Sequence, residues 1–227
     1  MNKFLLVAIN SKYIHSNLAV YCLKAATAYS DKVYIREFTI NNQLEDILKN
    51  IYLEKPDVIG ISCYIWNINY VKELLPELNK VLPGVKIWLG GPEVSYNTEE
   101  YAGRYENVAG VIKGEGEAVF KELMDCYMEG REKDIPFIPG ITTVSDGKII
   151  DNPCTLVYDM SDSVMPYYAA GYNEDDYKSA GSPVALTFEY GLVNDFLSEW
   201  CEIKTKLNNG EISPNEYFEW KITWPQA

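Results

Sequence analysis

Apolar-rich runs and helical patterns alternate along the first 130 residues of the chain. The apolar-rich runs have the length of buried strands and lie at 4–9, 33–38, 57–62, 85–89 and 108–112. Between them, apolar residues recur at helical spacing, which predicts helices over 17–29, 44–51, 71–81, 98–105 and 117–128. Five such units predict an α/β fold that is flavodoxin-like (Rossmann-like), with a doubly wound, five-stranded parallel sheet in the order 2-1-3-4-5.

The pattern changes after Gly130. Residues 141–150 read as two short strands around Asp146-Gly147, which is the signature of a hairpin with a tight turn. Residues 151–185 show little periodicity and are expected to be extended. Helical patterns return near the end, first as an apolar stripe (Leu192, Phe196, Trp200, Ile203 and Leu207) and then over 216–224.

These patterns divide the chain into three parts. We expect an α/β domain over residues 1–135, a hairpin and extended linker over 136–185, and a helical C-terminal tail over 186–227. The tail is too small for a core of its own. It is expected to dock on the main domain or on a partner, and a homodimer through the tail is one such assembly.

Composition narrows the range of partners. The formal net charge is −13, whereas proteins that grip nucleic acid or anionic membranes carry clusters of Lys and Arg. The five cysteines are scattered without a C-x-x-C pair, which argues against a zinc ribbon and favours a reducing compartment. The first apolar run is too short for a signal peptide, and no later run reaches transmembrane length. We therefore expect a cytoplasmic protein with no nucleic-acid or membrane partner.

Four loops follow the predicted strands at the edge where open parallel sheets bind ligands. They are Asn10–Ser16, Ser62–Asn67, Gly90–Ser95 and Gly114–Glu117. The two glycines of the third loop either make a tight turn or let a bulky ligand approach the backbone, since no Cβ stands in the way. The fourth lacks the spacing and the Lys of a phosphate loop, so a nucleotide site is not indicated. Its two carboxylates are expected to satisfy N–H groups at the start of the last helix.

Two of these loops carry a family resemblance. Trp88–Ser95 (WLGGPEVS) and Val111–Glu117 (VIKGEGE), with glycine motifs about twenty residues apart, resemble the cobalamin-binding domain that precedes the catalytic barrel in B12-dependent radical SAM proteins. That group includes relatives of the anaerobic magnesium-protoporphyrin monomethyl ester cyclase. Asn10–Leu18 and the hairpin followed by Asp-rich chain are similar to the same family, and the resemblance covers roughly residues 1–165.

The resemblance implies a site for cobalamin. The cofactor would lie across the carboxyl edge of the sheet, with its nucleotide tail between strands. The cofactor-binding residues that the resemblance implies come from the four loops and are Tyr13, Ile14, His15, Ser16, Ser62, Tyr64, Gly90, Gly91, Pro92, Glu93, Val94, Gly114, Glu115 and Gly116.

His15, the only histidine in the chain, is the candidate metal ligand. In methionine synthase and the mutases, the cobalt ligand lies in D-x-H-x-x-G, where the Asp orients the imidazole and the Gly opens space. Here Tyr13 and Leu18 stand at those two positions, so both supports are missing. We therefore expect a His-off mode, in which His15 bonds to backbone or packs beside the corrin, and keep cobalt ligation by His15 as the alternative.

The chain departs from the family in the part that carries catalysis. The family's barrel contains C-x-x-x-C-x-x-C, whose thiolates hold an iron–sulfur cluster for adenosylmethionine cleavage, and no three cysteines here have that spacing. A barrel of this kind needs roughly 200 residues or more, and about forty follow residue 188. We therefore expect no iron–sulfur cluster or SAM site in this chain, which resembles a truncated or reduced member with a radical SAM catalytic subunit as a candidate partner.

Three hypotheses about function stay open at this point. The first is a cobalamin-binding module that is not catalytic alone. The second is a flavodoxin-like enzyme that uses another cofactor, although there is no Ser/Thr-rich phosphate loop after the first strand and no G-x-S-x-G elbow. The third is a remnant that acts as an interaction domain, with Trp200, Trp220 and Trp224 as a partner-facing patch.

Overall fold

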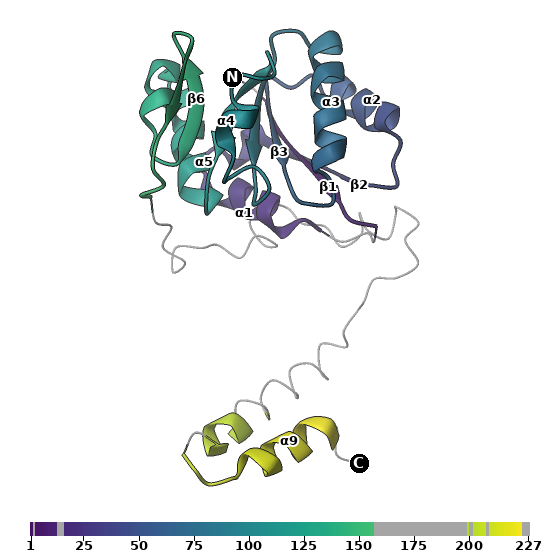
Figure 1. Cartoon of the computed structure of the whole chain (residues 1–227), viewed down its shortest axis with the longest axis vertical. Helices are drawn as coiled ribbons and strands as arrows, with labels where there is room; N and C mark the ends of the chain where they lie inside the picture. The colour runs from purple at the N-terminus through teal and green to yellow at the C-terminus, as the bar shows by residue number, and fades with distance from the viewer. Residues whose placement is uncertain (2, 13–15, 157–198, 200–201, 208, 224–227) are drawn as a thin grey trace. The chain divides into compact units, whose positions relative to one another are not determined.

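The computed structural model describes residues 1, 3–12, 16–156, 199, 202–207 and 209–223 (Figure 1). The chain forms two compact units, residues 1–172 and 173–227. The elements of the first unit are β1 (Phe4–Asn10), α1 (Leu18–Ala26), the 3-10 helix η1 (Ser30–Lys32), β2 (Val33–Thr39), α2 (Leu44–Glu54), β3 (Val58–Ser62), α3 (Ile68–Val81), β4 (Lys86–Gly90), α4 (Thr98–Tyr101), β5 (Val108–Ile112), α5 (Gly116–Met128), the 3-10 helix η2 (Glu132–Phe137), β6 (Ile141–Ser145) and β7 (Lys148–Asp151). The second unit contains α9 (Pro214–Thr223). The division of the chain at 135/136 and 185/186 stays a prediction.

Strands β1 to β5 form a parallel sheet in the predicted order. β1 lies between β2 and β3, β4 pairs with β3, and β5 pairs with β4, each pair parallel. The order β2-β1-β3-β4-β5 confirms the flavodoxin-like prediction. In such a sheet the chain changes direction between β1 and β3, and ligands bind beyond the carboxyl ends of the strands at this switch point.

The strand count differs from the prediction because the hairpin joins the sheet. β6 pairs with β5 in antiparallel register, with Ile112 opposite Ile141, and β7 pairs with β6. The sheet therefore has seven strands instead of five. Asp146 and Gly147 both have positive φ, 50° and 72°, as a two-residue hairpin turn requires. By covering the edge of β5, the hairpin protects backbone groups that a five-stranded sheet would leave open.

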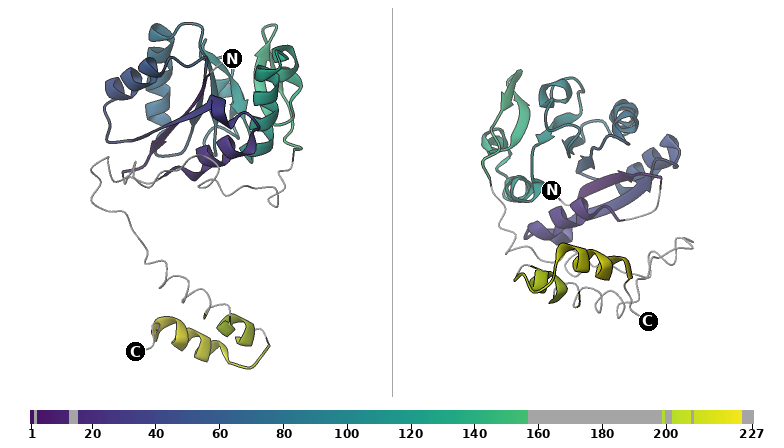
Figure 2. Two further views of the ribbon diagram at one scale, coloured as in Figure 1. Left: turned by 180° about the vertical axis from the view of Figure 1, so that it is seen from behind. Right: turned by 60° about the horizontal axis from the view of Figure 1, so that its bottom comes forward.

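Each face of the sheet buries its own core. Every residue of β1 is buried, and alternate side chains serve opposite faces. Leu5 and Ile9 pack with residues of α2 and α3, whereas Phe4 and Leu6 pack with residues of α1 and α5. Figures 1 and 2 show the two helix pairs on opposite sides of the sheet. Helices on both faces explain why the strands read as apolar-rich runs.

Some helix ends differ from the sequence prediction. α4 ends at Tyr101 instead of residue 105, and α1 ends at Ala26 instead of residue 29. Asn17 is the residue before α1, as expected, but its side chain makes no bond to the helix N–H groups. Its amide donates to Asn10 Oδ1 instead, at 3.2 Å. A tertiary partner has therefore replaced the local cap.

The described part of the tail is helical, as predicted. Residues 202–207 are helical, and α9 matches the predicted final helix within two residues at its start. A capping box begins α9, because the Ser213 N–H donates to Glu216 Oε2 (2.7 Å) and the Glu216 N–H donates to Ser213 Oγ (3.2 Å). Trp220 is buried, whereas Trp200 and Trp224 lie outside the described residues. None of the helices that the structure describes is long and apolar enough to span a membrane.

Candidate functional site

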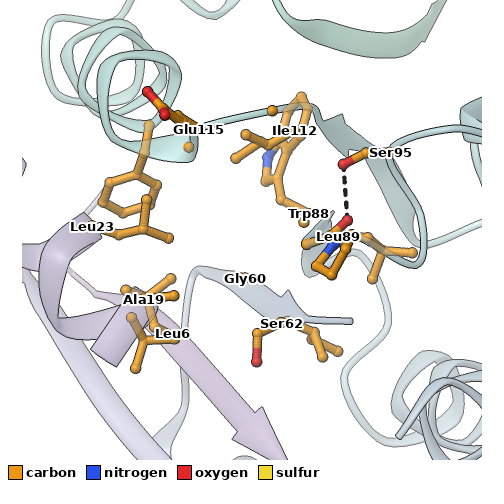
Figure 3. Close-up of a pocket in the computed structure, with 18 of the residues that line it drawn as sticks. Leu6, Ala19, Leu23, Gly60, Ser62, Trp88, Leu89, Ser95, Ile112 and Glu115 are labelled. Carbon is orange, nitrogen blue, oxygen red and sulfur yellow. Dashed lines mark hydrogen bonds between the residues drawn. The ribbon is translucent and has the colours of Figure 1, made fainter. Parts of the chain in front are cut away.

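A cavity of about 400 Å³ lies between the sheet and helices α1 and α5 (Figure 3). Val58 and Trp88 on β3 and β4 belong to the core on this side, so strand alternation turns Gly60, Ser62 and Gly90 to the same side. These three positions carry a hydrogen atom or a small CH₂OH group where a strand usually carries a larger side chain. The space that larger side chains would fill is left open at Ser62 and Gly90, whereas at Gly60 the side chains of Leu6 and Phe4 occupy it.

The walls of the cavity are mainly apolar. Figure 3 shows Ala19 and Leu23 of α1 and Ile112 at the end of β5 surrounding the space from different sides. The apolar lining as a whole comprises Phe4, Leu6, Ala19, Val20, Leu23, Ile61, Trp88, Leu89, Ile112 and Phe120. Pro92 and Tyr96, which is 90% exposed, mark the opening to solvent. A space of this volume and lining fits a small, largely apolar group.

Ser62 is the polar side chain in this cavity whose buried oxygen lacks a partner. Its Oγ is buried and makes no hydrogen bond, and it is the one buried side-chain N or O atom without a partner among residues the structure describes. Two other polar groups of the lining have partners, since Ser95 Oγ donates to the Gly91 carbonyl (2.8 Å) and Trp88 Nε1 donates to Tyr127 Oη (2.9 Å). An unsatisfied buried hydroxyl costs about 1–3 kcal/mol. A ligand that hydrogen-bonds to Ser62 would remove this cost.

The turn between β3 and α3 is fixed by a fully buried amide. Asn67 Nδ2 donates to the carbonyls of Ile9 and Ser62, both at 2.9 Å, and Asn67 Oδ1 accepts from the Tyr64 N–H at 2.8 Å. The Tyr64 and Trp66 rings stack with centroids 4.5 Å apart and planes 5° from parallel. Asn67 thus ties β1 to β3 at the switch point and holds a flat aromatic pair at the edge of the site.

Gly90, which ends β4, and Gly91, which follows it, lack a side chain for different structural reasons. Gly91 has φ 110°, and a Cβ there would lie 2.5 Å from the carbonyl oxygen of Cys63. The Cys63 N–H also donates to the Gly90 carbonyl at 2.7 Å, so two turns touch here through their backbones. A Cβ at Gly90 would meet only ordinary contacts at 3.7–3.8 Å. The bare backbone of Gly90 therefore opens the cavity, whereas that of Gly91 accommodates the neighbouring turn.

The loop between β5 and α5 forms a further wall. Gly114 has φ 68°, and a Cβ at Gly116 would lie 3.0 Å from Leu23 Cδ2, so Gly116 lets α5 approach α1 closely. Glu115 precedes α5 but makes no side-chain bond to the helix, contrary to the expectation that it caps the N–H groups. Glu117 lies in the first turn as expected. Burial, and to a lesser extent the Glu117 carboxylate, raises the pKa of the Cys22 thiol nearby.

Most of the sequence-predicted site residues that the structure describes come together around this one cavity. They are Ser62, Tyr64, Gly90, Gly91, Pro92, Gly114, Glu115 and Gly116. Three others do not line it. Ser16 and Glu93 are half-buried, and Val94 is fully buried in the core with α2 and α3.

The predicted residues Tyr13, Ile14 and His15 lie outside the described residues. Ligation of cobalt by His15 and the His-off mode therefore both stay predictions. In the parts of the chain that the structure does describe, no group of three or more His, Cys, Asp or Glu side chains could hold a metal ion.

Gly60 and Leu6 line the cavity but were not predicted from the sequence as site residues. Gly60 lies in the middle of an apolar strand run, and Leu6 lies in another. Gly60 could have been found, because a glycine inside a strand often marks a place where a ligand or another backbone comes close. A Cβ at Gly60 would lie 2.8 Å from Leu6 Cδ2, so part of the reason is packing between strands.

Comparison with known proteins identifies the family. The family model described as "B12 binding domain" matches residues 5–124. The chain belongs to the B12-binding domain family. Uncharacterized methyltransferase PH0819 of Pyrococcus horikoshii is 30% identical over 145 residues, which cover 62% of this chain and 30% of that protein. The cobalamin-dependent radical SAM methyltransferase TokK of Streptomyces tokunonensis is 28% identical over 88 residues, which cover 39% of this chain and 13% of that protein.

Solved structures share the fold of this B12-binding domain. The cobalamin-dependent radical SAM enzyme OxsB, with aqua-cobalamin and S-adenosylmethionine bound, matches with a TM-score of 0.59 at 18% identity over 74% of this chain and 25% of its own. The radical SAM methyltransferase TsrM from Kitasatospora setae matches with a TM-score of 0.53 at 17% identity over 69% of this chain and 31% of its own. The resemblance to the cobalamin-binding domain of B12-dependent radical SAM proteins is confirmed, and the chain spans less than a third of the length of these relatives.

Proposed function

We propose that this B12-binding domain holds cobalamin with the nucleotide tail in the cavity and the corrin ring across its rim, and that it presents the cofactor to a radical SAM catalytic domain or subunit. On this proposal the domain is not catalytic alone. The observation that carries it is the unpartnered Ser62 hydroxyl inside an apolar cavity of a B12-binding domain. When bound, cobalamin supplies a cobalt atom that can carry and transfer a methyl group.

The cavity suits the base of the cobalamin nucleotide. Dimethylbenzimidazole is a flat, apolar bicycle, and it has one ring nitrogen free to accept a hydrogen bond when that nitrogen is not bound to cobalt. The volume of about 400 Å³ is within the range of small-molecule sites, and the walls are aromatic and aliphatic. Ser62 Oγ can donate to that nitrogen, and Gly90 leaves room for the ring against the sheet.

The rim of the cavity suits the corrin ring. The stacked Tyr64 and Trp66 rings give a flat aromatic surface beyond the carboxyl end of β3. Ile65 beside them is 77% exposed, and Tyr96 extends the same kind of surface from the loop after β4. Exposed apolar side chains grouped around a cavity mark a surface that a ligand or partner covers.

The proposed mode is His-off. Tyr13 and Leu18 stand where a cobalt-ligating histidine of the D-x-H-x-x-G type has its Asp and Gly, so His15 lacks the partner that orients a ligating imidazole. The spectrum of bound cobalamin reports the ligand on cobalt. A His15→Ala variant should give the same bound spectrum as the wild type, and a shifted spectrum would show that His15 ligates cobalt.

Titration with hydroxocobalamin followed by gel filtration tests the function itself. Corrin absorbance that stays with the protein is the expected result, and Ser62→Ala should weaken binding about 2- to 12-fold, because one hydrogen bond contributes about 0.5–1.5 kcal/mol. Ser62→Ala should leave the unfolding free energy of the free protein unchanged or raised, since it removes an unsatisfied hydroxyl. Ser145→Ala, a half-buried serine outside the cavity lining, is the matched control.

The outcomes separate the hypotheses about function. A colourless protein after gel filtration would refute the cobalamin module and favour an interaction domain. A yellow protein that retains flavin would favour the flavodoxin-like enzyme. Retained cobalamin with an unchanged affinity in Ser62→Ala would place the nucleotide tail elsewhere.

A further inference from the structure

The last residue of β7 and the chain that follows it attach to one wall of the cavity. This strap (residues 151–154) contacts the segment around Gly114 without lining the cavity itself. Its own position is fixed by Asn152, whose Nδ2 donates to the carbonyls of Pro136 (2.8 Å) and Ile138 (2.9 Å) at the end of η2. The strap is therefore anchored independently of the wall that it contacts.

An ion pair joins the strap to the wall. Lys113, the residue directly before Gly114, donates from Nζ to Asp151 Oδ1 at 2.6 Å. The same carboxylate oxygen accepts from the hydroxyls of Thr142 and, at 3.4 Å, Thr98. These bonds, with Lys113 first among them, hold the pKa of Asp151 below its usual range. The Lys113 side chain is only 13% exposed, so removal of Asp151 would leave a largely buried ammonium without this carboxylate.

Backbone and thiol contacts continue the attachment. The Lys113 N–H donates to the Gly140 carbonyl (2.8 Å), and the Gly140 N–H donates to the Pro153 carbonyl (3.0 Å). Cys154 Sγ lies 3.7 Å from the Lys113 carbonyl oxygen and fills the place where a side chain at Gly114 would be, since a Cβ there would lie 2.8 Å from this sulfur. The strap thus contacts the wall directly through Asp151 and Cys154, and through Gly140 from Pro153.

The wall needs support of this kind because of its composition. Gly114 and Gly116 have no side chains with which to lock their own conformation, and glycine is the residue with the most backbone freedom. Gly114 moreover holds a positive φ of 68°. The geometry that the wall presents to a ligand must therefore come from its neighbours, and the strap supplies contacts on the side away from the cavity.

We propose that the strap and its Lys113–Asp151 ion pair position the Gly114–Gly116 wall for cobalamin, so that residues that never touch the cofactor set part of its affinity. The inference rests on the proposed function. Lys113 and Asp151 are positioning residues in this scheme, and the hairpin gains a role in the site beyond extending the sheet.

A double-mutant comparison tests the inference. Asp151→Asn and Lys113→Met should each weaken hydroxocobalamin binding about tenfold, and the double variant should bind no more weakly than either single variant, since both remove one interaction. Asp151→Glu should recover most of the affinity. Asp125→Asn is the matched control, because it removes a lysine–aspartate pair of similar length (Lys121 to Asp125, 2.8 Å) from the surface of α5 outside the cavity lining.

Hydrogen exchange of the free protein gives a readout that needs no ligand. Asp151→Asn should raise amide exchange about tenfold in 113–116 and in the strap while leaving β1 and β3 protected. An increase spread over the whole sheet would show a general loss of stability instead, and would overturn the positioning role.

The results distinguish the two proposals. A wild type that binds no hydroxocobalamin refutes the proposed function and the positioning role with it. A wild type that binds, with unchanged affinity in Asp151→Asn or an equal loss in Asp125→Asn, refutes the positioning role alone.

Discussion

Separate alanine substitutions at Gly90 and Gly91 would distinguish the glycine that opens the cavity from the glycine that the fold needs. At Gly91, φ is 110°, and the new Cβ would lie 2.5 Å from the Cys63 carbonyl oxygen and 3.1 Å from its nitrogen. Both contacts are with backbone, so relief requires movement of the whole turn after β3. At Gly90 the new Cβ would meet Ile112 at 3.7–3.8 Å, which is ordinary van der Waals contact.

The expected magnitudes follow from these distances. For Gly91→Ala, backbone strain of about 1–3 kcal/mol adds to overpacking of about 1–3 kcal/mol, so we expect a loss of about 2–6 kcal/mol in unfolding free energy. In a protein of this size, where each kcal/mol shifts the midpoint of thermal unfolding by about 2–4 °C, that midpoint should fall by roughly 4–24 °C. Gly90→Ala should be as stable as the wild type or up to about 1 kcal/mol more stable, because alanine restricts the unfolded chain. A methyl group in the cavity should nevertheless weaken cobalamin binding about 5- to 150-fold, if overpacking costs about 1–3 kcal/mol there.

Urea unfolding of the free proteins and titration with hydroxocobalamin measure the two effects separately. The two variants should give opposite patterns, with stability lost at Gly91 and affinity lost at Gly90. A Gly91→Ala protein as stable as the wild type would refute the argument from the Cys63 contact. Wild-type affinity in Gly90→Ala would show that the bare face of β4 is not where the ligand lies.

Two further predictions concern buried polar groups around the sheet. Burial raises the pKa of Tyr127, whose oxygen accepts a hydrogen bond from Trp88, to about 12, whereas an unfolded tyrosine ionises near pH 10. The folded state therefore favours the neutral phenol, and the stability that Tyr127 contributes is complete below about pH 10 and falls by about 2–3 kcal/mol as the pH rises towards 12. Urea unfolding at pH 9 and 11.5 should show this loss of stability, and the loss should be smaller in Tyr127→Phe. An equal loss in the variant would contradict the assignment to Tyr127. Asn67→Ala should lower the unfolding free energy by about 2–4 kcal/mol, because it leaves two carbonyls and one N–H at the β3–α3 turn without this partner; a loss under about 1 kcal/mol in urea unfolding would show that water replaces the amide.

The parallel part of the fold could be predicted because it rests on local patterns. Runs such as Phe4–Ile9 are apolar throughout, and a run of this short length indicates a strand that is covered on both faces. The pairing of β6 with β5 could not be predicted, since it depends on which edge of the finished sheet is free. Thr142 is an example. From the sequence alone a threonine in a hairpin is expected at the surface, but in the structure Thr142 is fully buried and its hydroxyl donates to Asp151.

The part of the candidate site that rests on local patterns could also be predicted from the sequence. Motifs that follow a strand, such as Gly90-Gly91, can be located at the carboxyl edge without coordinates. Val94 lies three residues further on and is buried in the opposite core, outside the cavity lining. The local rule also failed at Glu115, where the side chain was expected to cap α5 and makes no such bond. The spacing of residues along the chain does not show which core Val94 enters or whether Glu115 caps the helix.

The arrangement of bonds around the cavity favours a site that is largely formed before the ligand arrives. An apolar slot in a sheet tends to collapse unless its walls are held, since closing it removes apolar surface from water. Here each wall is held by polar groups directed away from the slot. Asn67 fixes the β3–α3 turn, Asp151 holds the segment before Gly114, and Glu37 accepts hydrogen bonds from the Asn17 N–H (2.6 Å) and the Tyr21 hydroxyl (2.8 Å) at the start of α1. Rigid walls reduce the ordering cost of binding, so a hydrogen bond as modest as that of Ser62 can contribute to affinity nearly in full.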